Sequence, residues 1–169
     1  LAGQRRQGTG KTPAGTFAIP RAFGRLADPG TELPYRQFDR NDAWTYNPDR
    51  PATYNVYQTS RAGWSGYGGY AEHLWSYGRQ YDYVAVMDYN LPGGPIRTGA
   101  DGVRRAASPA NTKAGGGIFL QAIEGGRSAV NELYGHIVRD SRHKDVVLLH
   151  YQEIMERRFG GWTMGQVNT

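Results

Sequence analysis

The chain changes character at a short apolar segment, residues 117–125, and this break limits the folds that it can adopt. Before the segment the sequence is rich in aromatic residues, glycine and proline, whereas after it the pattern is that of regular helix and strand. The segment itself predicts a strand, in which Gln121 is a polar residue between apolar ones, and the segment ends at Glu124-Gly125. We therefore expect two portions of different composition, residues 1–116 and 117–169, which can share one sheet through the strand at 117–123.

The composition favours a β-leaning fold. The 169 residues include 38% hydrophobic residues, 24 Gly, 9 Pro and 12 Tyr, which is typical of a loop-rich globular protein rather than a helical one. No run approaches the roughly 18 apolar residues that a membrane helix needs, so no membrane span is expected. The fold class predicted from these features is α+β.

Charge and cysteine content exclude several kinds of site. The chain has no cysteine, which excludes disulfides, thiolate metal sites and a cysteine nucleophile. The net charge is +5, but basic residues occur as scattered pairs such as Arg104 and Arg105, which argues against a nucleic-acid partner. His136, His143 and His150 lack ligand spacing and a carboxylate pair, so no metal site is expected.

The first portion contains short strands between turns. Residues 81–89 are rich in β-branched and aromatic residues and predict the clearest strand of this portion. Residues 91–116 contain many glycines and prolines, and this composition predicts a long irregular loop.

A series of motifs in the first 120 residues resembles a known enzyme family. The motifs are GKTPAGTF at 10–17, AFG at 22–24, PGT at 29–31, LPYR at 33–36, AEHLW at 71–75, YDY at 81–83 and GGGIFL at 115–120. In this order they resemble the L,D-transpeptidase catalytic domain, of the YkuD type, found in bacterial cell-wall enzymes. The resemblance implies a β-rich fold, an extracytoplasmic location and a peptidoglycan peptide as the partner.

The residues at the transpeptidase site depart from that family. Its chemistry uses a histidine directly after the Ile-Phe-Leu strand and a cysteine several residues further on, which attacks a peptide carbonyl. Gln121 stands at the histidine position, and a glutamine cannot act as the base. The leading interpretation is therefore a transpeptidase-like domain without catalysis, with no cofactor and with His73 as a candidate for the substrate cleft.

The second portion has a different pattern. After the strand at 117–123, Ser128 is the expected N-cap of a helix. The apolar face of this helix would consist of Val130, Leu133, Tyr134, Ile137 and Val138. An apolar strand is then expected at 145–150 and a short last strand at 162–165. The order strand, helix, strand, strand is half of a ferredoxin-like domain.

Residues 117–169 also resemble a family, the BLUF domain, a flavin-binding sensor of blue light. The matching residues are Phe119-Leu120-Gln121, Glu124-Gly125, Asp140, Arg142-His143, Val147-Leu148-Leu149, Arg158-Phe159 and Trp162-Thr163-Met164-Gly165. The resemblance implies FAD as the cofactor and Gln121 as the glutamine that contacts the flavin ring. It also implies that Arg142 and His143 flank the cofactor, and that Trp162 and Met164 respond to its rearrangement.

The alternative function is therefore a BLUF-type photosensor module. A side-chain amide has donor and acceptor ends, so Gln121 can switch its hydrogen bonds when light alters a flavin. The structural reading is that Gln121 pairs with backbone at a sheet edge, Trp162 and Met164 fill a core, and Arg142-His143 form the basic end of a helix. A third interpretation is a chimeric chain without an evolved function. The location would be extracytoplasmic if the first portion determines it and cytoplasmic if the second does.

Overall fold

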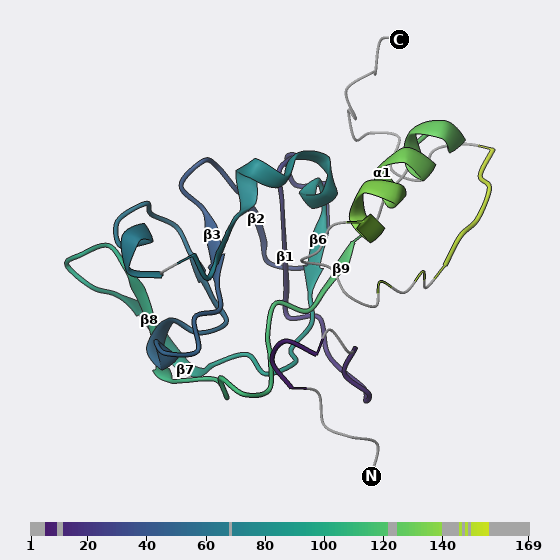
Figure 1. Ribbon diagram of the computed structural model, residues 1–169. Coiled ribbons are helices and arrows are strands. Elements are labelled where there is room, and N and C mark those ends of the chain that lie inside the picture. Colours follow the sequence, from purple (N-terminus) through teal and green to yellow (C-terminus); the bar gives the residue numbers. More distant parts are fainter. Residues whose placement is uncertain are drawn as a thin grey trace.

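The computed structural model describes residues 6–9, 12–67, 69–121, 125–139, 146, 148 and 150–155 of the chain. Short strands and 3-10 helices precede one α-helix in this part of the chain. The 3-10 helices are η1 (Pro51–Thr53), η2 (Trp64–Tyr67) and η3 (Leu74–Tyr81), and the α-helix is α1 (Arg127–Arg139). In Figure 1, α1 lies at the opposite end of the molecule from the strands β7 and β8.

One sheet combines strands from both sides of the compositional break. It contains β1 (Arg21–Gly24), β2 (Tyr35–Gln37), β6 (Val84–Val86) and β9 (Phe119–Gln121), in the order β2-β1-β6-β9. The pair β1 and β2 is parallel, whereas β6 runs antiparallel to β1 and to β9. The strand predicted around 117–123 therefore forms an edge of the sheet that the first portion builds, and residues 122–124 lie outside the described residues.

The second sheet lies entirely within the first portion. It contains β3 (Ala43–Thr45), β4 (Val56–Gln58) and β5 (Ala71–His73), in the antiparallel order β4-β3-β5. The strand expected over 81–89 is shorter, because η3 extends to Tyr81 and β6 covers only Val84–Val86. The β-rich character expected for the first portion is present, in short strands joined by 3-10 helices.

The prediction of a long irregular loop over 91–116 is wrong. This stretch contains an antiparallel hairpin, β7 (Gly93–Thr98) and β8 (Arg104–Ser108). Glycine and proline favour strand interruption, but here the register shifts between Gly93 and Ile96, and Gly94 has a φ of 68°. Glycine at an irregularity of a hairpin is compatible with strand pairing, since it adopts positive φ without steric cost.

The two sheets meet at an aromatic cluster centred on Phe23 of β1. The Phe23 ring lies 6.1 Å from Trp44, 5.5 Å from Tyr57 and 5.4 Å from Phe119, measured between ring centroids. Phe119 of β9 also packs edge-on against Trp44, at 4.9 Å. The first strand after the compositional break is thus part of the same core as β1, β3 and β4.

The buried side chain of Asn55 connects three segments beside this cluster. Its Oδ1 accepts hydrogen bonds from Nε1 of Trp44 at 2.9 Å and from the backbone N–H of Gly117 at 2.8 Å. Its Nδ2 donates to the carbonyl of Asn90 at 2.6 Å. A Cβ atom at Gly116 would lie 2.5 Å from this side chain, so only glycine permits such a close approach. Asn55 therefore determines where the chain enters β9.

Helix α1 agrees with the predicted helix except at two points. It begins at Arg127, so Ser128 lies inside its first turn rather than at the N-cap, and Val130 N–H donates to the carbonyl of Gly126. Ile137 is buried, but Val138 is 47% exposed and does not belong to the apolar face as predicted. Leu133 is half-buried, as expected for that face.

The later strands of the second portion are not seen in the described residues. Residues 146, 148 and 150–155 belong to no strand. The other residues of the strand predicted at 145–150, and the whole strand predicted at 162–165, lie outside the described residues. The ferredoxin-like arrangement therefore stays a prediction beyond β9 and α1.

Replacing Asn55 with glycine should destabilise the protein strongly. The change leaves the buried Trp44 Nε1 and the part-buried Gly117 N–H without their acceptor, which costs about 2–4 kcal/mol in total. The φ of Asn55 is 58°, so Asn55→Ala should lose about 1 kcal/mol more than Asn55→Gly, because Ala is strained in this region. Urea unfolding of both variants measures these values, and a loss under about 1 kcal/mol for Asn55→Gly would contradict this role.

Candidate functional site

Gln121 lies at the end of β9, on the face of the sheet that carries the aromatic cluster. Register pairs Gln121 with Val84 of β6, and Val84 with Phe23 of β1, so these three residues form one row across the sheet. Paired residues of neighbouring strands point to the same face. Gln121 and Phe119 are two residues apart and therefore share that face as well.

The amide of Gln121 is half-buried and is not hydrogen-bonded to any described side chain or backbone group. A purely structural role, in which the Gln121 side chain pairs with backbone at the sheet edge, would need a hydrogen bond that is not present within the described residues. The amide retains a donor and an acceptor for another group. Gln121 is thus held by its backbone in the ladder with β6, while its side chain has no hydrogen-bond partner among the described residues.

The other four candidates for flavin contact lie outside the described residues. They are Arg142, His143, Trp162 and Met164. Their roles remain those implied by the resemblance. Among the sequence-predicted site residues, the structure therefore places Gln121 and His73.

His73 is the last residue of β5, in the second sheet, and it packs on Trp64. The ring centroids of His73 and Trp64 are 3.8 Å apart. The guanidinium of Arg61 also contacts Trp64, at 5.0 Å from its ring centroid. Burial lowers the pKa of His73, and the positive charge of Arg61 lowers it further. His73 is therefore held in its neutral form in a different sheet from Gln121.

Three buried polar atoms in this region lack hydrogen-bond partners in the described structure. They are Nδ1 of His73, Nε1 of Trp64 and Oη of Tyr67. Trp64 and Tyr67 belong to one small cluster with Ala71 and Val103. A neutral imidazole nitrogen can accept a hydrogen bond and an indole N–H can donate one. His73 and Trp64 together therefore offer a hydrogen-bond acceptor and a donor.

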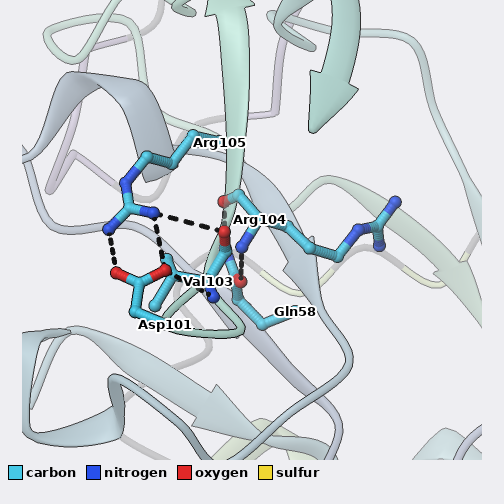
Figure 2. A network of polar contacts seen from close by, with 5 residues as sticks. All are labelled: Gln58, Asp101, Val103, Arg104 and Arg105. Carbon is cyan, nitrogen blue, oxygen red and sulfur yellow. Dashed lines mark hydrogen bonds and ion pairs between the residues drawn. The ribbon is translucent and has the colours of Figure 1, made fainter. Parts of the chain in front are cut away.

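The β7–β8 hairpin is held by two polar contacts that point in different directions (Figure 2). Arg105 forms a two-pronged ion pair with Asp101, with an Nη2 to Oδ2 distance of 2.6 Å, which lowers the pKa of Asp101 to about 2. The Gln58 side chain instead exchanges two hydrogen bonds with the backbone of Arg104, at 2.8 and 2.9 Å. The second contact attaches β8 to β4 and directs the Arg104 side chain away from Arg105.

The described part of the chain contains neither of two other kinds of site, a metal-binding cluster and a membrane-spanning helix. No three His, Cys, Asp or Glu side chains in it are grouped so that they could hold a metal ion. None of its helices has the length and hydropathy needed to cross a membrane.

Comparison with known proteins supports the second resemblance. Residues 113–165 match the BLUF family, described as sensors of blue-light using FAD. The photoactivated adenylate cyclase subunit beta of Euglena longa is 43% identical over 49 residues, which are 28% of this chain and 6% of that protein. The alpha subunit of Euglena gracilis is 48% identical over 44 residues, 26% of this chain and 4% of that protein. No solved structure matches the chain.

These matches change the weight of the two sequence interpretations. The BLUF-like segment is supported by the family and by both relatives, whereas nothing in the comparisons supports the L,D-transpeptidase interpretation, which had been the leading one. The expectation that no cofactor binds is likewise unsupported, since the matched family is described by its use of FAD. The chain spans less than a tenth of the length of these relatives, and its segment 113–165 is similar to the BLUF family.

His73 should make the stability of the protein depend on pH. Its pKa in the folded state lies below the unfolded value of 6.5, so folding favours the neutral form. The stabilisation is complete above pH 6.5 and is lost as the pH falls through the folded pKa, because the unfolded chain then binds the additional proton. Urea unfolding at several pH values between 7.5 and 4.5 should show a smaller decrease for His73→Gln than for the unchanged protein. Equal slopes for the two proteins would rule out this contribution.

Proposed function

We propose that residues 113–165 form a flavin-binding module that senses blue light, with Gln121 as the amide that responds to the cofactor. One observation supports the proposal most directly. The segment that matches the BLUF family contains β9, and β9 presents a half-buried glutamine whose amide has no described hydrogen-bond partner. This supports Gln121 as a group that faces a ligand rather than one that stabilises the sheet.

The chemistry of Gln121, the described candidate for flavin contact, is compatible with a flavin. The polar edge of a flavin ring has hydrogen-bond donors and acceptors, and a free side-chain amide complements both. When bound, FAD would supply the absorption of blue light. The chain would supply Gln121 from β9, and Arg142 and His143 beside the cofactor as the resemblance implies.

The position of Gln121 is well suited to a site that must be held firmly. Its strand is paired along its length with β6, and Phe119, two residues earlier, is packed against Trp44 and Phe23. A binding side chain on a rigid element keeps its geometry better than one on a loop. These contacts support a role in which the Gln121 backbone stays in place while its amide changes partners.

The proposal concerns light sensing by this segment. The relatives are named as photoactivated adenylate cyclases, but the similarity covers only 6% and 4% of their lengths. No cyclase activity is therefore proposed for this chain. The N-terminal strands β1 and β6 would act as the support on which the segment is built, because β9 is paired with β6.

The test is to purify the full chain with excess FAD, remove the free cofactor and record the visible spectrum before and after blue illumination. We expect a retained flavin band that shifts reversibly with light. Gln121→Leu should keep the bound flavin and lose the light-dependent shift, because leucine has a similar size but no hydrogen-bonding group.

The matched control is Gln37→Leu. Gln37 lies in β2, at the other edge of the same sheet, and its amide donates to the carbonyl of Arg25. The control variant should keep both the flavin band and its shift. Absence of any flavin band in the unchanged protein would overturn the proposal, and an unchanged shift in Gln121→Leu would overturn the role of Gln121.

A further inference from the structure

Three arginines from separate strands gather around one pair of aromatic rings. The Arg21 guanidinium of β1 lies 5.8 Å from the Trp44 ring centroid, and that of Arg36 of β2 lies 5.7 Å from the Tyr57 ring centroid. The two rings are 6.1 Å apart. Arg104 of β8 donates from Nη1 to the Tyr57 carbonyl at 2.8 Å. We call Arg21, Arg36 and Arg104 the arginine cluster.

Strand register determines the positions of Arg21 and Arg36. Arg36 is paired with Phe23 in the parallel ladder of β1 and β2, and Arg21 precedes Phe23 by two residues. The side chains of Arg21, Phe23 and Arg36 therefore lie on the face of the sheet that meets Trp44 and Tyr57. Two of the three cations are thus positioned by the same sheet that forms the aromatic cluster.

The third cation of the cluster, Arg104, belongs to β8 of the β7–β8 hairpin. Gln58 binds the backbone of Arg104 through both ends of its amide, and Gln58 itself is 1% exposed. The Arg104 side chain donates to the carbonyl of Tyr57, the residue before Gln58 in β4. The position of each guanidinium is therefore determined by a strand rather than by a loop.

The negative charge beside the cluster is insufficient for three cations. The buried carboxylate of Asp42 binds Arg36 at 3.0 and 3.2 Å and also accepts the backbone N–H of Asp39 at 2.8 Å. Arg21 has no ion pair or hydrogen bond to any described side chain, although it is half-buried. Burial of the Tyr57 hydroxyl, followed by the charge of Asp42, raises the pKa of Tyr57, so this hydroxyl adds no negative charge at neutral pH.

The electrostatics of Arg21 and Arg104 agree with this imbalance. For Arg36, in contrast, burial is outweighed by the hydrogen bond and ion pair with Asp42, which raise its pKa. Burial lowers the pKa of Arg21, and the charge of Arg104 lowers it further. Burial also lowers the pKa of Arg104, with the charge of Arg36 as the next cause. Arg104 thus repels both Arg21 and Arg36 at a place where water is partly excluded, and an anion bound there would relieve this repulsion.

We propose that the arginine cluster binds a small oxyanion, the carboxylate or phosphate group of a ligand. A guanidinium presents several N–H donors in one plane and matches the oxygens of both groups. The Arg36 side chain is 47% exposed, so solvent reaches the cluster at this side. Arg21 would supply the main contact because its donors are free within the described structure. This site is independent of the flavin proposal, since it uses residues before position 113.

The experiment measures anion binding to the full chain by NMR, with the side-chain Nε–Hε signal of Arg21 as the probe. Inorganic phosphate and citrate are titrated separately at constant ionic strength, with chloride as the reference anion. We expect a saturable shift of the Arg21 signal with at least one of the two anions, at millimolar concentration. Saturation with phosphate alone would identify a phosphate site, and saturation with citrate alone a carboxylate site.

The variants separate a specific site from general attraction to a basic protein. Affinity, followed by isothermal calorimetry, should fall at least tenfold in Arg21→Gln. The matched control is Arg40→Gln, because Arg40 also lies over a tryptophan, 5.3 Å from the Trp75 ring centroid, and is outside the cluster. It should bind within twofold of the unchanged protein.

A fourth protein covers the case in which Arg21→Gln does not fold. Arg21→Lys keeps the charge but loses the planar donors, and its affinity should fall severalfold. The proposal would be overturned if the unchanged protein showed no saturable binding of either anion. It would also be overturned if Arg40→Gln lost as much affinity as the cluster variant that folds.

Discussion

The amide of Asn55 is the interaction on which the arrangement of the two portions depends. It is completely buried, and it joins the indole of β3, the backbone before β9 and the loop after β6. Without Asn55 the buried indole N–H would lack its hydrogen bond, and the part-buried backbone groups of Gly117 and Asn90 would lose theirs, which is costly where water is excluded. Asn90 extends the network, because its side chain binds the backbone of Asn111 and of Gly115. The chain from 111 to 117 is thereby held before the compositional break is reached.

The break in the sequence is therefore not a break in the structure. Phe119 enters the aromatic cluster within two residues of Gly117, and β9 completes its ladder with β6. The cost of ordering such a short strand is offset by the burial of an aromatic side chain and by the backbone hydrogen bonds of the ladder. A boundary drawn at residue 117 from composition alone separates residues that pack in one core.

Local patterns predicted part of the fold from the sequence. The β-rich first portion, a strand that includes Phe119–Gln121 and a helix near 128–138 all follow from apolar periodicity. The hairpin at 93–108 could not be predicted in this way, because its pairing uses a glycine irregularity and the contact between Gln58 and Arg104, which are far apart in sequence. The role of Asn55 likewise depends on partners 11, 35 and 62 residues away.

The candidate sites also differ in whether local sequence pattern or contacts between distant residues identify them. Gln121 was identified from its place in a motif, and the structure adds that its amide is unpartnered in the described residues. The arginine cluster was not identified, since its members are distant in sequence. One local signal existed, because Arg21 alternates with Phe23 in a strand and so puts a cation on an apolar face.

Gln121 and two members of the arginine cluster, Arg21 and Arg36, lie on the same face of one sheet, and this has a consequence for the proposed function. Val84 separates Gln121 from Phe23 in one row, and Val86 separates Phe119 from Arg21 in the next row on that face. A change of hydrogen bonding at Gln121 would therefore act on a rigid edge strand whose neighbours are the packed aromatic rings. Closely packed interiors transmit small displacements because they contain little free volume. Under the proposed function, the N-terminal portion is thus the part of the molecule that a change at the flavin would reach first.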